Sequence, residues 1–224
     1  MRVLLITDWP RRPGGVEAYF TTLRPALAEA GHEVALLTST AGSAADGTAD
    51  FRALGTERLL PQTVLQIANP FAVAAVRRAV GRFRPDVALV AMVESHLSPA
   101  AALALGDVPT VWSINDYKPI CPVAVKLLPD GTPCTVSAGA VCWRGGCVGR
   151  AHWARDRPRY ALLGRAIARA GVVVTCSEWM RRALAADGIP ARVLHLPSPP
   201  PSAEYVRAPA TDPLLVFVGR LSRE

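Results

Sequence analysis

Short apolar runs that alternate with helix-length amphipathic segments constrain the fold of this chain most strongly. The runs are rich in valine, leucine and isoleucine and are apolar almost throughout, as in strands that are buried on both faces. Such strands, separated by helices, are typical of a parallel sheet with helices on both sides. The pattern predicts a Rossmann-like, doubly wound α/β domain that binds ligands at the carboxyl ends of its strands. The predicted strands are residues 3–7, 33–38, 87–93, 108–114, 171–175 and 192–196.

The segments between these strands carry helix signals. Pro70 suits the first turn of one helix, and Ser98 followed by Pro99 is typical of a helix start. Ser177 is a second candidate for a capping residue, and residues 41–66 show no clear pattern. The predicted helices are residues 15–30, 69–84, 98–105, 159–170 and 177–186.

The chain also carries signs of domain organisation. Residues 1–196 form the predicted Rossmann-like domain, and residues 118–157 interrupt its alternation with a cysteine-rich insert. Residues 197–213 contain three consecutive prolines and are predicted to be a stiff interdomain linker. Residues 214–224 begin with an apolar strand that has nothing to pair with. We therefore expect the chain to be a fragment whose second domain starts there.

The composition is that of a globular and basic protein. Half of the residues are hydrophobic, and the formal net charge is +7, with Lys118 and Lys126 as the only lysines. This charge indicates either a solvated surface or attraction to an anionic partner, such as a nucleotide diphosphate or a membrane surface. The arginines are scattered along the chain rather than gathered with aromatic residues in one stripe, so no nucleic-acid partner is expected.

Hydropathy indicates the cellular compartment of the protein, and the compartment in turn limits the chemistry of its cysteines. No apolar run reaches the roughly 18 residues that span a bilayer, and the N-terminal apolar run is too short for a signal peptide. We therefore expect a cytoplasmic protein, in which clustered cysteines favour metal or thiol chemistry. Four thiolates can hold a structural zinc ion, although no C-x-x-C pair is present. Disulfides, free thiols and an iron–sulfur cluster are the alternatives for Cys121, Cys134, Cys142 and Cys147.

A glycine pair lies between the first predicted strand and the first predicted helix. Gly14 and Gly15, followed by Glu17, would let the backbone approach a ligand, and a helix N-terminus offers free N–H groups to an anion. The alternative is simple turn chemistry. The G-x-G-x-x-G fingerprint is absent, which disfavours a nicotinamide-dependent oxidoreductase.

Four segments in order resemble glycosyltransferase family 4, whose members have the GT-B fold of two facing Rossmann-like domains. The first is the glycine pair, and the second is Asn115-Asp116-Tyr117 followed by Ile120-Cys121-Pro122. The third is Cys176-Ser177-Glu178-Trp179-Met180-Arg181, and the fourth is Phe217-Val218-Gly219-Arg220-Leu221. A subset of the family has a similar cysteine-rich insert.

The resemblance implies a retaining transfer of sugar from a nucleotide-sugar donor to an acceptor hydroxyl, with no cofactor required for catalysis. It places Gly14 and Gly15 near the donor, and Arg220 at the diphosphate leaving group, where a guanidinium stabilises developing charge. A solvated arginine is the alternative for Arg220. The resemblance further implies that Asn115, Asp116 and Tyr117 lie near the sugar or acceptor.

One position departs from the family pattern. Asn115 stands where the family tends to have histidine, and asparagine cannot titrate. His96, near the end of a predicted strand, is another candidate for the cleft, unless it is a satisfied or solvent-facing histidine. The departure favours a second hypothesis, that of a non-catalytic carbohydrate- or partner-binding module.

The segment 143–159 is rich in arginine and tryptophan. It is either an exposed helix entry or a surface that meets a phosphorylated acceptor or a membrane. Many family members build lipid-linked or cell-envelope glycans at the inner face of the membrane. The resemblance therefore implies a glycan or lipid-linked acceptor and possible peripheral membrane contact.

Overall fold

The structure is a computed structural model that describes residues 1–9, 15–41 and 49–196, with backbone only for residues 15–18. Gly14 and Arg220 lie outside the described residues, as do the predicted linker 197–213 and the predicted strand from residue 214.

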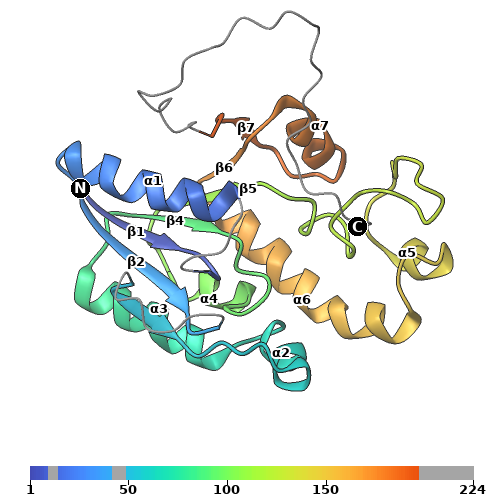
Figure 1. Ribbon diagram of the computed structural model, residues 1–224, viewed down its shortest axis with the longest axis horizontal. Coiled ribbons are helices and arrows are strands. Elements are labelled where there is room, and N and C mark those ends of the chain that lie inside the picture. The colour runs from blue at the N-terminus through green and yellow to red at the C-terminus, as the bar shows by residue number, and fades with distance from the viewer. Residues whose placement is uncertain (10–14, 42–48, 197–224) are drawn as a thin grey trace, which may run out of the picture.

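The described residues form one parallel sheet of seven strands in the order β3-β2-β1-β4-β5-β6-β7 (Figure 1). Every pair of neighbouring strands is parallel. The predicted Rossmann-like α/β fold is confirmed. The strands are β1 (Arg2–Ile6), β2 (Glu33–Ser39), β3 (Phe51–Ala53), β4 (Val87–Ala91), β5 (Thr110–Ile114), β6 (Val172–Thr175) and β7 (Arg192–Val193).

Helices connect the strands and cover both faces of the sheet. Side chains of α3, α4, α6 and α7 share one core cluster with one face, whereas α1 packs on the other (Figure 1). Strand β1 shows the alternation directly, because Leu4 and Ile6 join the first cluster and Val3 and Leu5 the second. The helices are α1 (Gly15–Glu29), α2 (Leu59–Leu65), α3 (Pro70–Phe83), α4 (Pro99–Leu103), α5 (Ala140–Arg144), α6 (Arg150–Arg169) and α7 (Glu178–Ala186).

The strand order reverses its direction between β1 and β4. The chain leaves β1 toward β2 on one side, while β4 leads to β5 on the other. In folds of this kind, the connections that follow two such strands diverge at the carboxyl edge, where ligands bind. We call this region between β1 and β4 the crevice. The topology therefore places the candidate site between β1 and β4.

Of the two predicted helix caps, Ser177 is confirmed and Ser98 is wrong, and Asn69 is a cap that was not predicted from the sequence. Asn69 caps α3 by accepting from the backbone N–H groups of Phe71 and Ala72. Ser177 caps α7 in the same way. Ser98 precedes α4 but makes no capping bond, because its hydroxyl instead accepts from the N–H of Asn69 at 2.9 Å.

The insert contains more regular structure than its sequence indicates. Helix α6 begins at Arg150, although residues 118–157 were predicted to lack helical periodicity and a helix was expected only from residue 159. It continues through Pro158. The insert also contains α5 and a short turn closed by a bridge between Leu127 and Pro133. The unassigned segment 41–66 contributes β3 and α2.

No single helix of the described residues is long and apolar enough to cross a membrane. Helices α2 and α3, which meet at 54°, meet the length and composition criteria only when taken together.

Substitution of Asn69 tests the junction between α3 and the loop after β4. Asn69 is fully buried, and its amide also donates to the carbonyls of Leu54 and His96, both at 2.7 Å. Asn69→Ala removes a helix cap and takes away the donor of one buried and one part-buried carbonyl, so it should lower the free energy of unfolding by about 3 kcal/mol. Urea denaturation measures this loss.

Ser177→Ala is the matched control, because it removes only a capping hydroxyl and should cost about 1 kcal/mol. Equal losses for the two variants would contradict the role of Asn69 as a junction.

Candidate functional site

Acidic side chains from three neighbouring strands converge at the carboxyl edge of the sheet. Asp8 follows β1, Glu94 follows β4 and Asp116 follows β5. Asp8 and Glu94 are 1% and 4% exposed, and both Asp116 and Asp8 raise the pKa of Glu94. The crevice between β1 and β4 is therefore an acidic site.

Asp8 holds the loop that follows β4. Its carboxylate accepts from the backbone N–H groups of Ser95 (2.7 Å), His96 (3.0 Å) and Leu97 (2.7 Å). Burial raises the pKa of Asp8, and these backbone hydrogen bonds oppose that shift. Asp8 thus joins β1 to the loop that carries Glu94 and His96.

Glu94 has the electrostatic properties of an acid–base group. Burial, followed by the charge of Asp116, raises its pKa to about 7, while Lys118 and Arg159 oppose that rise. A carboxyl group with a pKa near neutrality exchanges a proton readily at physiological pH. Perturbed carboxyl groups of this kind are typical of functional sites.

Lys118 links the loops after β4 and β5. Its ammonium group donates to the Ser95 hydroxyl at 2.7 Å, and its backbone N–H donates to Asp116 at 3.0 Å. Burial raises the pKa of Asp116, and Lys118 opposes the shift through both its N–H and its charge. Lys118 therefore supplies positive charge within the acidic crevice.

Arg159 of α6 adds a second cation. The side chain is 2% exposed, and one terminal nitrogen donates to Asp156 at 3.2 Å. Its Nε and Nη1 atoms have no hydrogen-bond partner among the described residues. Its charge lowers the pKa values of Glu94 and Asp116, so it lies within electrostatic reach of the crevice.

His96 is buried beside the crevice rather than exposed. Its ring meets Trp9 edge to face, with centroids 4.3 Å apart. Neither ring nitrogen has a hydrogen-bond partner of good geometry among the described residues. Burial lowers the pKa of His96, which favours the neutral imidazole.

The structure brings several predicted site residues together. Asn115 and Asp116 lie at the end of β5, and the Asn115 amide donates to Ser113 at 2.9 Å. The Asn115 carbonyl oxygen is buried without a partner among the described residues. Tyr117 instead lines a separate cavity of about 360 Å³ between the 125–135 turn and α7.

The described residues include only part of the predicted donor site. Gly15 begins α1 directly after the loop from β1, so the N-terminus of this helix lies at the carboxyl edge. Glu17 lies in the first turn of α1, and its side chain is outside the described residues. Gly14 and Arg220 are outside them altogether.

Sequence reasoning missed three residues of the crevice, namely Asp8, Glu94 and Lys118. Two of them carry a readable signal, because Asp8 and Glu94 each follow closely after a buried strand. Lys118 carries no such signal, because the fold of the loop after β5 brings its ammonium group to Ser95, and no local sequence pattern predicts that fold.

The four insert cysteines are neighbours but do not form a metal site as placed. All are free thiols, with Cys121 and Cys142 buried. The pKa of Cys147 is raised by burial and by the other three cysteines. Among the described residues, no group of three or more histidine, cysteine or acidic side chains is arranged to hold a metal. The zinc site therefore stays a prediction.

The fold and the acidic crevice define one Rossmann-like lobe with a site at its topological switch point. The family model for Glycosyltransferase Family 4 matches residues 13–199. The chain belongs to this family. Among curated protein sequences, none matches the chain.

Solved structures share the fold at low sequence identity. Sucrose-phosphate synthase from Thermosynechococcus elongatus superposes with a TM-score of 0.55 at 16% identity, over 87% of this chain and 47% of that one. A protein from Listeria monocytogenes, described as a UDP-N-acetylglucosamine 2-epimerase, has a TM-score of 0.51 at 14% identity, over 84% and 42%. The chain thus spans less than half the length of either structure.

Glu94→Gln tests the electrostatics of the crevice. The folded state keeps the Glu94 proton up to a pKa of about 7, whereas the ordinary value is 4.5. The folded state binds more protons between these values, so this carboxyl group lowers stability as the pH rises through that window. The stability of Glu94→Gln relative to the wild type should therefore increase from pH 4.5 to pH 8, by up to about 3 kcal/mol. Urea denaturation across this pH range measures the difference.

Glu178→Gln is the control with the opposite sign. Arg181 lowers the pKa of the exposed Glu178, so this carboxylate stabilises the fold above its ordinary pKa and loses that effect as the pH falls. A flat pH profile for Glu94→Gln would contradict the buried acidic crevice.

The cysteine loop has its own test. If the thiols bind structural zinc, elemental analysis of the purified protein should find about one zinc ion per chain, held at a four-thiolate site. A folded loop without metal would end that interpretation, and thiol titration under reducing conditions would then count free cysteines.

Proposed function

We propose that this chain is the acceptor-side half of a glycosyltransferase that moves a sugar from a nucleotide-sugar donor to an acceptor hydroxyl, with retention at the anomeric carbon. The observation that carries the proposal is the convergence of Asp8, Glu94 and Asp116 with Lys118 at the switch point of a family 4 domain. The complete enzyme would include a second lobe that closes over this edge.

The chemistry of the crevice supports this role. Glu94, whose pKa is about 7, would accept or return the proton of an acceptor hydroxyl. Asp116 and Asn115 would orient hydroxyl groups of the sugar or acceptor. The unpartnered Asn115 carbonyl oxygen is available to accept such a hydrogen bond.

The donor phosphates would dock at the N-terminus of α1. Gly14 and Gly15 would allow close backbone approach there, and the helix start offers N–H groups to an anion. Arg220 would neutralise the leaving diphosphate. The Listeria protein, which shares the fold, is named for a UDP-sugar, and that name supports a uridine nucleotide as the first donor to test.

The acceptor would be a glycan or a lipid-linked saccharide, consistent with work at the cytoplasmic face of a membrane. No metal or other cofactor takes part in this proposed transfer, and the predicted zinc ion would be structural.

A second candidate is a binding module without catalysis. The specific observation in its favour is Asn115, which cannot titrate where the family tends to have histidine. Such a module would keep the crevice and bind carbohydrate without transferring it.

Donor binding and turnover in the complete protein separate these functions. Saturation-transfer NMR with UDP-glucose and UDP-N-acetylglucosamine should show contact with the nucleotide sugar. Glu94→Gln and Asp116→Asn should each lower kcat by roughly 100-fold, because each removes an acid–base or positioning carboxylate. Radiolabelled sugar transfer measures the rate.

Asp86→Asn provides the control, because this carboxylate lies at the opposite edge of the sheet and accepts from the N–H of Arg2. It should leave kcat unchanged. Donor binding without turnover would favour the binding module. If no nucleotide sugar binds, the proposed transferase is overturned.

A further inference from the structure

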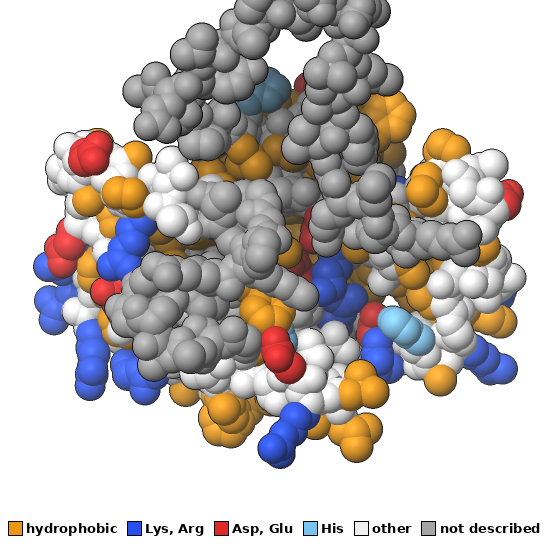
Figure 2. Space-filling view, in the orientation of Figure 1, with side chains coloured by type: hydrophobic (Ala, Val, Ile, Leu, Met, Phe, Trp, Pro, Cys, Tyr) orange, Lys and Arg blue, Asp and Glu red, His pale blue; other side chains and the backbone are white. Residues whose placement is uncertain are grey.

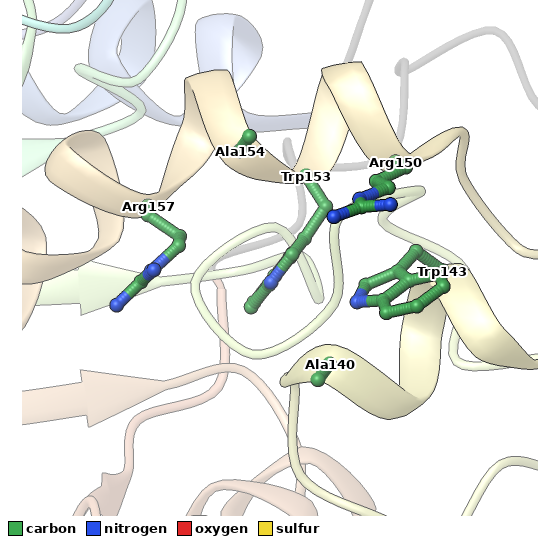
Figure 3. A pocket seen from close by; sticks show the side chains of 6 residues that line it. All are labelled: Ala140, Trp143, Arg150, Trp153, Ala154 and Arg157. Atoms are coloured by element: carbon green, nitrogen blue, oxygen red, sulfur yellow. The ribbon is translucent and has the colours of Figure 1, made fainter.

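A second cavity, of about 580 Å³, lies between α5 and the first turns of α6 (Figure 3). We call it the tryptophan cradle. Its volume falls in the range of about 300–1,000 Å³ that is typical of small-molecule sites. The cradle is lined by Ala140, Trp143, Arg150, Trp153, Ala154 and Arg157.

Helical spacing builds one wall of the cradle. Arg150, Trp153 and Arg157 follow one another at intervals of three and four residues, which places them on one face of α6. Figure 3 shows the Trp153 and Arg157 side chains extending from the same side of α6, with Arg150 beside Trp143 of α5. The small side chain of Ala140 lies on α5 below the two indole rings (Figure 3).

The charges in the cradle are positive and available. Arg150 lies over the Trp143 ring at 5.6 Å, and Arg144 lies over it at 5.4 Å. No acidic residue lines the cavity. Among the described residues, no hydrogen bond or ion pair engages Arg150 or Arg157. The cradle therefore offers guanidinium groups to an anion.

The nearest acid on this helix is already occupied. Asp156 is 2% exposed and is bound by Arg155 at 2.9 Å and by Arg159 at 3.2 Å, with His152 at 3.3 Å. The Asp156 carboxylate is thus paired with side chains that do not line the cradle. These contacts leave the positive charge of the cradle without a counterion from this carboxylate.

Contacts connect the cradle to the acidic crevice. The rings of Trp153 and Tyr160 lie 5.9 Å apart, and the Tyr160 hydroxyl donates to the Lys118 carbonyl at 3.1 Å. Lys118 in turn contacts Ser95 within the crevice. The cradle is thus joined to the proposed catalytic site through the side chains of Trp153 and Tyr160 and through Lys118.

The cradle differs from a purely basic surface because it contains both aromatic and basic side chains. On the face shown in Figure 2, basic side chains lie in separate places, at the left, near the centre, at the bottom and at the right. A broad basic surface would attract any anion, whereas the cradle combines two aromatic faces with two arginines in a defined cavity. This combination requires a ligand with both an apolar face and a negative charge.

We propose that the tryptophan cradle binds an anionic saccharide, that is, a sugar ring carrying a phosphate or carboxylate group. The positively polarised C–H face of a sugar packs on the electron-rich face of an indole ring. Arginine binds phosphate or carboxylate in bidentate fashion. This inference rests on the proposed function for its biological role, because it makes the ligand the acceptor of the transferase.

Isothermal titration of the full chain with glucose 1-phosphate tests binding directly. We expect measurable affinity, with at least tenfold weaker binding of methyl glucoside, which lacks the charge, and of inorganic phosphate, which lacks the ring. Arg157→Gln and Trp153→Leu should each weaken the binding of glucose 1-phosphate at least tenfold. Arg157 is exposed, so its substitution leaves the packing of α6 in place.

Trp179→Leu and Arg182→Gln are matched controls in the neighbouring cavity beside α7. They should leave the affinity for glucose 1-phosphate unchanged. If these variants lose affinity and the cradle variants keep it, the ligand binds beside α7 and the proposal is overturned. Equal affinity for glucose 1-phosphate and inorganic phosphate would also overturn it. So would binding of phosphatidylglycerol vesicles through Trp153 and Arg157 without binding of the sugar phosphate, because the surface would then be a membrane contact.

The donor experiment separates this inference from the proposed function. Binding of a nucleotide sugar without binding of glucose 1-phosphate at the cradle would overturn only the cradle. Binding of glucose 1-phosphate without any nucleotide sugar would leave an anionic-saccharide site and overturn the transferase.

Discussion

The candidate site depends on one buried carboxylate at the end of β1. Asp8 accepts three backbone N–H groups from the loop after β4 and so holds the two strands together where their connections diverge. Without these bonds, that loop would lack partners for three buried or half-buried N–H groups. The positions of Glu94, of the Ser95 hydroxyl and of His96 all follow from this contact. The sheet itself thus holds the loop that carries Glu94 and His96.

Opposing charges then set the chemistry of the crevice. Burial and the neighbouring carboxylates push the pKa of Glu94 upward, whereas Lys118 and Arg159 limit the rise to about 7. Neither cation comes from the sheet. Lys118 belongs to the loop after β5, and Arg159 to helix α6 beyond the insert. The insert and the helix that follows it therefore contribute to the site, in addition to forming the tryptophan cradle.

Sequence reasoning was most successful where local chemistry and burial agree. Six of the seven strands described and the cap at Ser177 were predicted, because apolar runs and capping side chains act over a few residues. Strand β3 and the cap at Asn69 were not predicted. Sequence reasoning failed at Ser98, whose hydroxyl binds Asn69 instead of its own helix. It also placed the start of α6 nine residues too late, because the segment from Arg150 to Pro158 has no apolar stripe of its own.

The sequence by itself determined the α/β class and the family, because buried parallel strands and short motifs are local patterns. It also indicated that Asn115 and Asp116 follow a strand at the edge where ligands bind. Only the tertiary structure decided which titratable groups meet. Asp8, Glu94 and Asp116 are far apart in the chain and come together because parallel strands end at one edge. The raised pKa of Glu94 is a property of that meeting, since burial and neighbouring charge exist only after the sheet has formed.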